Sequence, residues 1–143
     1  METLNHECYV SLEVAKLLKQ ARFDWKTEYA YVDELFCPMR SFSSNFNSWG
    51  IKIHEFVSAP TLDVAQRWLR EVKGYYVAWE FNMNISPWGQ ELYDFTDISV
   101  YIFVDSEQGN ICKCKLKENY KTIEEAQEAG IKKVVEMILE EEK

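Results

Sequence analysis

The sequence predicts an α+β fold built around an antiparallel sheet, and three observations support this prediction. A helical pattern over residues 61–73 leads directly into an alternating pattern over 75–85. Two more alternating runs, 92–104 and 111–117, follow after short turns, and an amphipathic segment after residue 122 closes the chain. We therefore expect a three-stranded meander in the C-terminal half, one or two earlier strands, and about three helices packed on one face of the sheet.

Length and composition fit one α+β domain spanning residues 1–143. Hydrophobic residues make up 47% of the chain and aromatic residues 15%, which is enough to fill a core without disulfides or metals. The net charge of −8 argues against nucleic-acid binding driven by a basic surface. No basic N-terminal segment leads into an apolar run, and no stretch of 18 apolar residues occurs, so we expect a cytoplasmic protein.

A first helix is expected after Ser11, because its hydroxyl can accept a hydrogen bond from a first-turn amide. Polar residues occupy one side of this segment, so the helix should pack its other side on the core. The apolar residues that recur at helical spacing are Val14, Leu17, Leu18 and Ala21.

The segment 23–58 is rich in aromatic residues but has a weak periodicity. Two runs within it, 29–36 and 49–57, have the composition of strands. The stretch between these runs has turn chemistry, and we expect a loop held in place by Phe42 and Phe46.

The strongest pattern is a helix followed at once by a long strand. Thr61 is the expected N-cap of the helix, and Gly74 is the expected residue just past its end. Trp68 lies on the apolar side of the helix and Trp79 on the apolar side of the strand, so both should belong to the main core. The strand residues that alternate toward the core are Tyr75, Val77, Trp79, Phe81, Met83 and Ile85.

Turns and alternation predict the rest of the meander and the closing helix. Turn residues 86–89 separate the first long strand from a second, and Gly109 lies in the turn before a third. Thr122 and Glu125 form a capping box that begins the closing helix. Gly130 lowers the helical propensity in the middle of that helix and indicates a close approach to the sheet. The apolar residues that alternate in the second and third strands are Ile98, Val100, Ile102, Val104, Cys112, Cys114 and Leu116.

The pairing of these strands predicts a candidate binding face on the side away from the helices. With Trp79 turned toward the core, the opposite face carries Glu80 near Asp97 at one end and lysines at the other. Aromatic rings beside cations suit a protein interface or a single-stranded ligand, whereas the alternatives are a solvated face or one covered by the segment before residue 58. In this pairing Tyr76 lies near Tyr101, Lys113 beside Phe103 and Lys115 beside Tyr101. The predicted binding residues are Tyr76, Tyr101, Phe103, Lys113 and Lys115.

No catalytic residue, metal site or cofactor is predicted. Cys112 and Cys114 are two residues apart on a strand, which is not a paired metal chelate, so we interpret them as reduced thiols packed as small apolar groups. Completing a zinc site would require ligands from elsewhere, at His6, Cys8 or Cys37. His54 falls in an alternating run that makes it an exposed strand residue, and glycine patterns for phosphate binding are absent from the sequence.

Several short segments carry a family resemblance. They read YVSLEVA at 9–15, APTL at 59–62 and AQRWLRE at 65–71, and they accompany an aromatic-rich segment and a glutamate-rich terminal helix. Together they resemble a family of small uncharacterised proteins from gut Bacteroidetes and their phages and mobile elements. The resemblance implies a small cytoplasmic or phage-associated accessory protein, and it carries over no catalytic residue.

We therefore predict a non-enzymatic interaction protein, associated with a phage or mobile element, that binds a protein partner or a second copy of itself through the aromatic-rich sheet face. Two alternatives stay open. One is an acidic phage-encoded inhibitor that mimics nucleic acid and occupies a basic host protein. The other is a small hydrolase that uses Glu80, Asp97 or His54. No membrane contact is expected, and the acidic charge makes nucleic acid a poor partner.

Overall fold

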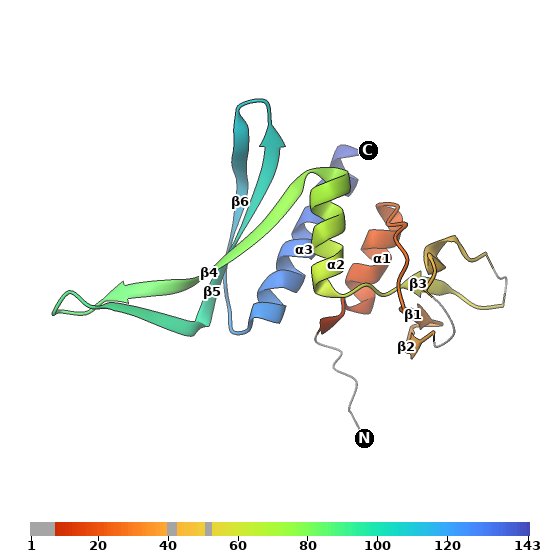
Figure 1. The fold of residues 1–143 in the computed structure, drawn as a ribbon, viewed down its shortest axis with the longest axis horizontal. Coiled ribbons are helices and arrows are strands. Elements are labelled where there is room, and N and C mark those ends of the chain that lie inside the picture. The colour runs from red at the N-terminus through yellow and green to blue at the C-terminus, as the bar shows by residue number, and fades with distance from the viewer. Residues whose placement is uncertain (1–7, 40–42, 51–52) are drawn as a thin grey trace, which may run out of the picture.

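The protein has three helices that lie between two antiparallel sheets, as the computed structural model of residues 8–39, 43–50 and 53–143 shows (Figure 1). The predicted α+β class is therefore confirmed. The helices among the described residues are α1 (Leu12–Gln20), α2 (Leu62–Trp68) and α3 (Ile123–Glu141). One sheet has the strand order β2-β1-β3, with β1 at Tyr29–Val32, β2 at Leu35–Pro38 and β3 at Phe56–Ser58. The other has the order β4-β5-β6, with β4 at Tyr75–Ile85, β5 at Glu91–Ser106 and β6 at Gly109–Tyr120.

Each helix begins directly after the residue that the sequence predicts as its cap. The hydroxyl groups of Ser11, Thr61 and Thr122 accept hydrogen bonds from the backbone amide three residues further on, at 3.3, 3.2 and 3.1 Å. These bonds satisfy amides that a helix start leaves unpaired, which is why the helix starts could be read from local sequence.

The predicted helix over residues 61–73 changes its winding before it ends. It is α-helical as far as Trp68 and continues as a π-helical turn, η3 (Leu69–Lys73), to Gly74 at a φ of +74°. The wider turn rotates the following side chains away from the α-helical positions. Val72 lies four residues after Trp68, so a regular α-helix would place both on the apolar side, but Val72 is 52% exposed. Trp68 is buried in the main core, as predicted.

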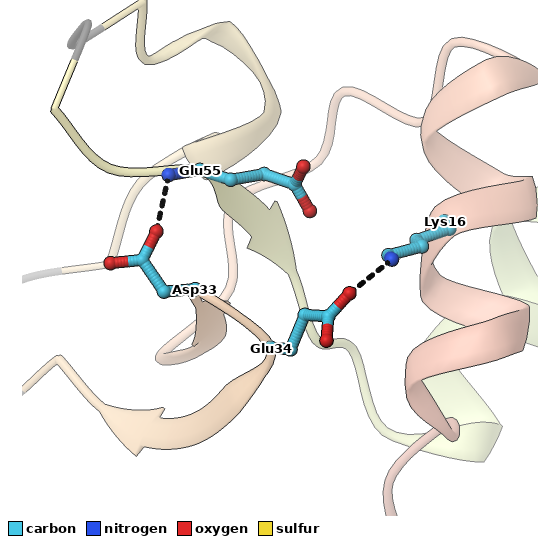
Figure 2. Close-up of polar contacts among 4 residues, drawn as sticks. All are labelled: Lys16, Asp33, Glu34 and Glu55. Carbon is cyan, nitrogen blue, oxygen red and sulfur yellow. Dashed lines mark hydrogen bonds and ion pairs between the residues drawn. The ribbon is translucent and has the colours of Figure 1, made fainter.

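The first sheet differs from the prediction because the run 29–36 is a hairpin and not one strand. Asp33 and Glu34 form its turn at φ values of +49° and +72°, the combination that type I′ hairpin turns require. Figure 2 shows how neighbouring elements hold this turn. The Lys16 Nζ on α1 donates to Glu34 Oε1 at 3.0 Å, and the Glu55 backbone amide donates to Asp33 Oδ1 at 2.9 Å.

The early strands also form a sheet of their own beyond the helices, so they do not add to the meander (Figure 1). The second predicted run, 49–57, contributes only the three residues of β3 at its end. Phe46 is buried beside β3, in a short 3-10 turn, η2 (Phe46–Ser48), as the expected loop anchor. Phe42 lies outside the described residues.

The second sheet is the predicted meander, and α3 packs across one of its faces. Gly130 allows this packing, since a Cβ atom there would clash with the Val77 side chain and lie 3.1 Å from Val100 Cγ1. The predicted close approach of helix and sheet is confirmed. The main core under the helices includes Phe23, Trp68 and Ile102. No helix among the described residues is long and apolar enough to cross a membrane.

Trp79 does not belong to the main core, contrary to the prediction. It is half-buried against a second cluster formed by Ile98, Val100 and Ala126, beside the first turn of α3. Alternation placed its side chain on the correct face of the sheet, but at this end of the sheet the cluster around Trp79 includes helix residues only from the start of α3.

Candidate functional site

The register of the second sheet decides which predicted site residues meet. Glu80 lies opposite Ser99, not Asp97, and Tyr76 lies opposite Phe103, not Tyr101. Over residues 75–81 of β4 the pairing is displaced by two residues from the predicted one, which keeps these side chains and their β5 partners on the predicted faces. The register then shifts at a bulge after Phe81, where residues 95–97 of β5 have no partners on β4.

The side of β4-β5-β6 turned away from the helices, here called the open face, carries a polar and aromatic row across all three strands. The Tyr101 hydroxyl donates to Glu80 Oε1 at 2.7 Å, and Lys115 Nζ lies 5.2 Å from the centre of the Tyr101 ring. Lys115 is paired with Tyr101, as predicted. Tyr76 donates a longer bond, 3.4 Å, to Asp105 Oδ2. Four predicted residues are thereby brought together: Tyr76, Tyr101, Phe103 and Lys115.

Lys113 is the exception, because a bulge in β6 makes it an extra residue. Phe103 pairs with Cys112, and Ile102 pairs with Cys114, which leaves Lys113 without a partner between them. The bulge also separates the two thiols, which alternation had placed together on the core side. Cys114 is half-buried against the main core, but Cys112 is exposed on the open face beside Phe103.

Beyond the bulge after Phe81, the β4–β5 hairpin leaves the body of the protein and projects as a two-stranded arm (Figure 1). We define the arm as residues 82–95. A two-stranded hairpin is marginally stable in water by itself, and this one has apolar side chains that solvent reaches. The exposed large apolar residues of the arm are Met83, Ile85, Trp88, Leu92, Tyr93 and Phe95.

One side of the arm continues the sheet face that α3 covers in the body. Phe81 packs edge to face on Trp79 at 5.4 Å and on Phe95 at 4.8 Å between ring centres, so the aromatic contacts run from the body into the arm. Met83 and Ile85 follow Phe81 by alternation, and Tyr93 lies opposite Met83. Sequence analysis placed Met83 and Ile85 on the core side, but α3 does not reach them, and they are exposed.

The arm is acidic as well as apolar. The sequence has no Lys or Arg between Lys73 and Lys113. Asp94 Oδ1 accepts bonds from the amide and the hydroxyl of Thr96, at 2.9 and 2.6 Å, and these bonds hold the pKa of Asp94 below its usual value. The Tyr93 hydroxyl donates to Glu91 Oε2 at 3.1 Å, which raises the pKa of Tyr93. The Asp94 carboxylate therefore stays ionised at neutral pH.

A second place of interest is a groove of about 470 Å³ between α1, β1 and the start of α3. Its wall holds Glu128, whose Oε1 accepts from the Ser11 amide at 3.0 Å and whose Oε2 is buried without a hydrogen-bond partner. Burial, reinforced by the nearby Glu13, raises the pKa of Glu128. Such a carboxyl can exchange a proton, but the described residues lining the groove include no imidazole, thiol or cation.

Glu128 is absent from the predicted site residues, although the sequence carries a signal for it. It lies three residues before Ile131 and therefore near the buried side of the predicted terminal helix. A carboxylate on the apolar side of a helix marks either a buried hydrogen bond or a proton-exchanging group, and this one makes the bond to Ser11.

The three residues of the hydrolase alternative bond to different partners in different places. Glu80 accepts from Tyr101, and Asp97 accepts from Asn82 Nδ2 at 2.9 Å. His54 lies in a turn before β3, on the other side of the helices, where its Nδ1 pairs with Asp33 Oδ2. No group of three His, Cys, Asp or Glu residues in the described part of the chain is arranged to hold a metal ion.

Comparisons of the chain with protein-family models, with curated proteins and with solved structures gave no match.

Proposed function

We propose that this chain is a non-enzymatic interaction protein that binds a protein partner, or a second copy of itself, through its second sheet. The single observation that carries the proposal is the arm, which presents six large exposed apolar side chains on a projecting hairpin. Exposed apolar residues scattered singly are ordinary, but a contiguous group of this kind is typical of an interaction site.

Energetics favour this function over a structural role for the arm. Fully burying a side chain such as Ile85 or Phe95 contributes about 1.5 to 3 kcal/mol, and the isolated protein leaves most of this contribution unused. A partner that covers the arm would gain this free energy of burial on binding. The open face lies on the same sheet and adds Tyr101, Phe103 and Lys115, residue types that are common at protein interfaces.

The accessory role in a phage or mobile element, which the family resemblance implies, is part of this proposal, as is a cytoplasmic location. The acidic inhibitor remains the second candidate, and the acidic character of the arm favours it. The two candidates differ in the surface that they require. Mimicry of nucleic acid works through charge, whereas the arm combines charge with a large apolar surface.

The experiment compares self-association and partner capture among four proteins. Sedimentation velocity and capture from native host lysate are measured for the parent, Phe95→Ser on the arm, Tyr101→Ser on the open face and Leu35→Ser on β2. Leu35 is the matched control, because it is 68% exposed, as is Phe95, but belongs to the first sheet.

The proposal expects the parent and Leu35→Ser to form the same complex, and expects Phe95→Ser, Tyr101→Ser or both to lose it. Whichever of the two is lost identifies the side of the sheet that binds. The proposal is contradicted if the parent stays monomeric and captures no partner whose binding is weakened by Phe95→Ser or by Tyr101→Ser.

A further inference from the structure

The helix-side face of the arm is the part of its surface formed by Met83, Ile85, Tyr93 and Phe95. We propose that this face binds a basic amphipathic helix of a partner protein, which would continue the layer that α3 forms over the body of the sheet. The inference rests on the proposed function and adds the chemistry of the partner.

The helix-side face of the arm is continuous with the face that α3 covers. In the body, Ile123 and Ala126 of the first turns of α3 pack with Trp79 and Phe81. The same face continues past Phe81 into the arm through the contact with Phe95, but no described element of the chain packs over it there. The arm therefore extends a helix-binding surface beyond the last helix that could fill it.

The shape of the surface favours a helix over a strand. Apolar side chains point out of one face of the hairpin, and face-on packing of a sheet in this protein is done by α3. An added strand would pair with the edge of β4 or of β5 in the arm, where it would leave the side chains of Ile85 and Phe95 uncovered.

Charge decides what the rest of that helix carries. Glu91 lies on the helix-side face, opposite Ile85, and accepts a hydrogen bond from the Tyr93 hydroxyl. No cation occurs in the sequence between Lys73 and Lys113. A lysine or arginine side chain flanking the apolar stripe of a helix would meet this carboxylate. A second copy of the chain is the poorer occupant, because two arms packed together would bring their carboxylates together without a cation of their own.

A model peptide tests this chemistry directly. The probe is a labelled amphipathic peptide of about 14 residues, long enough to form a helix, with leucine on one side and lysine on the other. Its counterpart carries glutamate in place of every lysine. Binding of each peptide to the full-length chain is measured by fluorescence anisotropy at low and at high salt.

The lysine peptide should bind about tenfold or more tightly than the glutamate peptide at low salt, and salt should reduce this preference. Ile85→Ser and Phe95→Ser should each weaken binding about tenfold, whereas Leu35→Ser should leave it unchanged. Glu91→Gln removes the negative charge and should therefore reduce the preference for the lysine peptide. The Tyr93 hydroxyl can still donate to the amide oxygen, so the local hydrogen bond is kept. Urea unfolding of each variant establishes that it is folded.

Three results would overturn the inference. One is equal affinity for the two peptides, or binding that Phe95→Ser does not change. A second is binding of the arm to phosphatidylcholine vesicles that the lysine peptide does not compete for, which would make the occupant a lipid surface. The third is a dimer that Phe95→Ser dissociates in a protein that binds neither peptide, which would make the occupant a second copy. In that last case, and where lysate capture still depends on the arm, the proposed function stands and the inference about the partner's chemistry fails.

Discussion

Phe81 and Phe95 pack edge to face at 4.8 Å, and the contact joins a half-buried ring to one that is 68% exposed. Phe81 belongs to the cluster that the first turns of α3 cover, and Phe95 is the first ring that they leave uncovered. The boundary between the core and the interaction surface of this protein therefore runs between these two side chains.

Trp68→Ala should lower the free energy of unfolding by about 3 to 5 kcal/mol, the range for deleting a large buried aromatic side chain. Trp68 is 1% exposed and packs against Phe23 at 5.2 Å between ring centres. Urea denaturation measures the loss. Trp88→Ala is the matched control, because Trp88 is 87% exposed on the arm, and its loss should stay below about 1 kcal/mol. Similar losses for the two tryptophans would show that the helix face is misassigned.

Gly130→Ala should destabilise the protein by about 1 to 3 kcal/mol, although alanine is the better helix former by about 1 kcal/mol. The added methyl group would clash with the stiff Val77 side chain. A double-mutant cycle with Val77→Ala checks the cause, since the smaller side chain makes room and the double variant should lose less than the sum of the two. An increase in stability for Gly130→Ala alone would mean that α3 lies further from the sheet.

Glu128→Gln should stabilise the protein at neutral pH and leave it nearly unchanged in acid. A carboxyl whose pKa is raised in the folded state binds its proton more tightly there than in the unfolded chain. Its favourable contribution is fully present below the ordinary glutamate pKa and is lost as the pH rises through the raised pKa. Glutamine stays neutral and keeps an acceptor for the Ser11 amide, so it avoids that loss. Urea midpoints at about pH 4 and about pH 7.5 measure the difference, which should grow with pH; a difference that grows toward acid would refute the assignment.

Cys112 should react with a thiol reagent at least about tenfold faster than Cys114, because exposure governs access to the thiolate. The bulge in β6 places Cys112 on the open face and Cys114 against the core. The rates are measured with Ellman's reagent on variants that keep one of these cysteines and carry serine at the other positions. Equal rates would mean that the bulge is absent and that both thiols lie on one face.

Local signals explain what the sequence predicted well. Ser11, Thr61 and Thr122 cap helices through bonds to amides three residues away, so their role is contained in a few adjacent residues. Alternation likewise identified the faces of β4 and β5, and it brought Tyr101 and Lys115 together. These features depend on backbone geometry within or between neighbouring segments.

The errors arose where tertiary packing decides the outcome. The bulges after Phe81 and beside Lys113 insert residues that alternation cannot reveal, so the register shifted and Lys113 lost its predicted partner. Alternation also cannot tell whether a face is covered. Met83 and Ile85 have the pattern of core residues, yet α3 begins too far along the sheet to reach them, and they became part of the arm.

Phe95→Ser tests the central claim most directly when capture of partners and self-association are compared with those of Leu35→Ser, the equally exposed control. If the arm serves association, Phe95→Ser should unfold within about 1 kcal/mol of the parent and still lose about tenfold or more of the complex, while Leu35→Ser keeps it. A Phe95→Ser protein that loses about 3 kcal/mol of stability and forms the same complexes as the parent would contradict the claim, because the arm would then belong to the core.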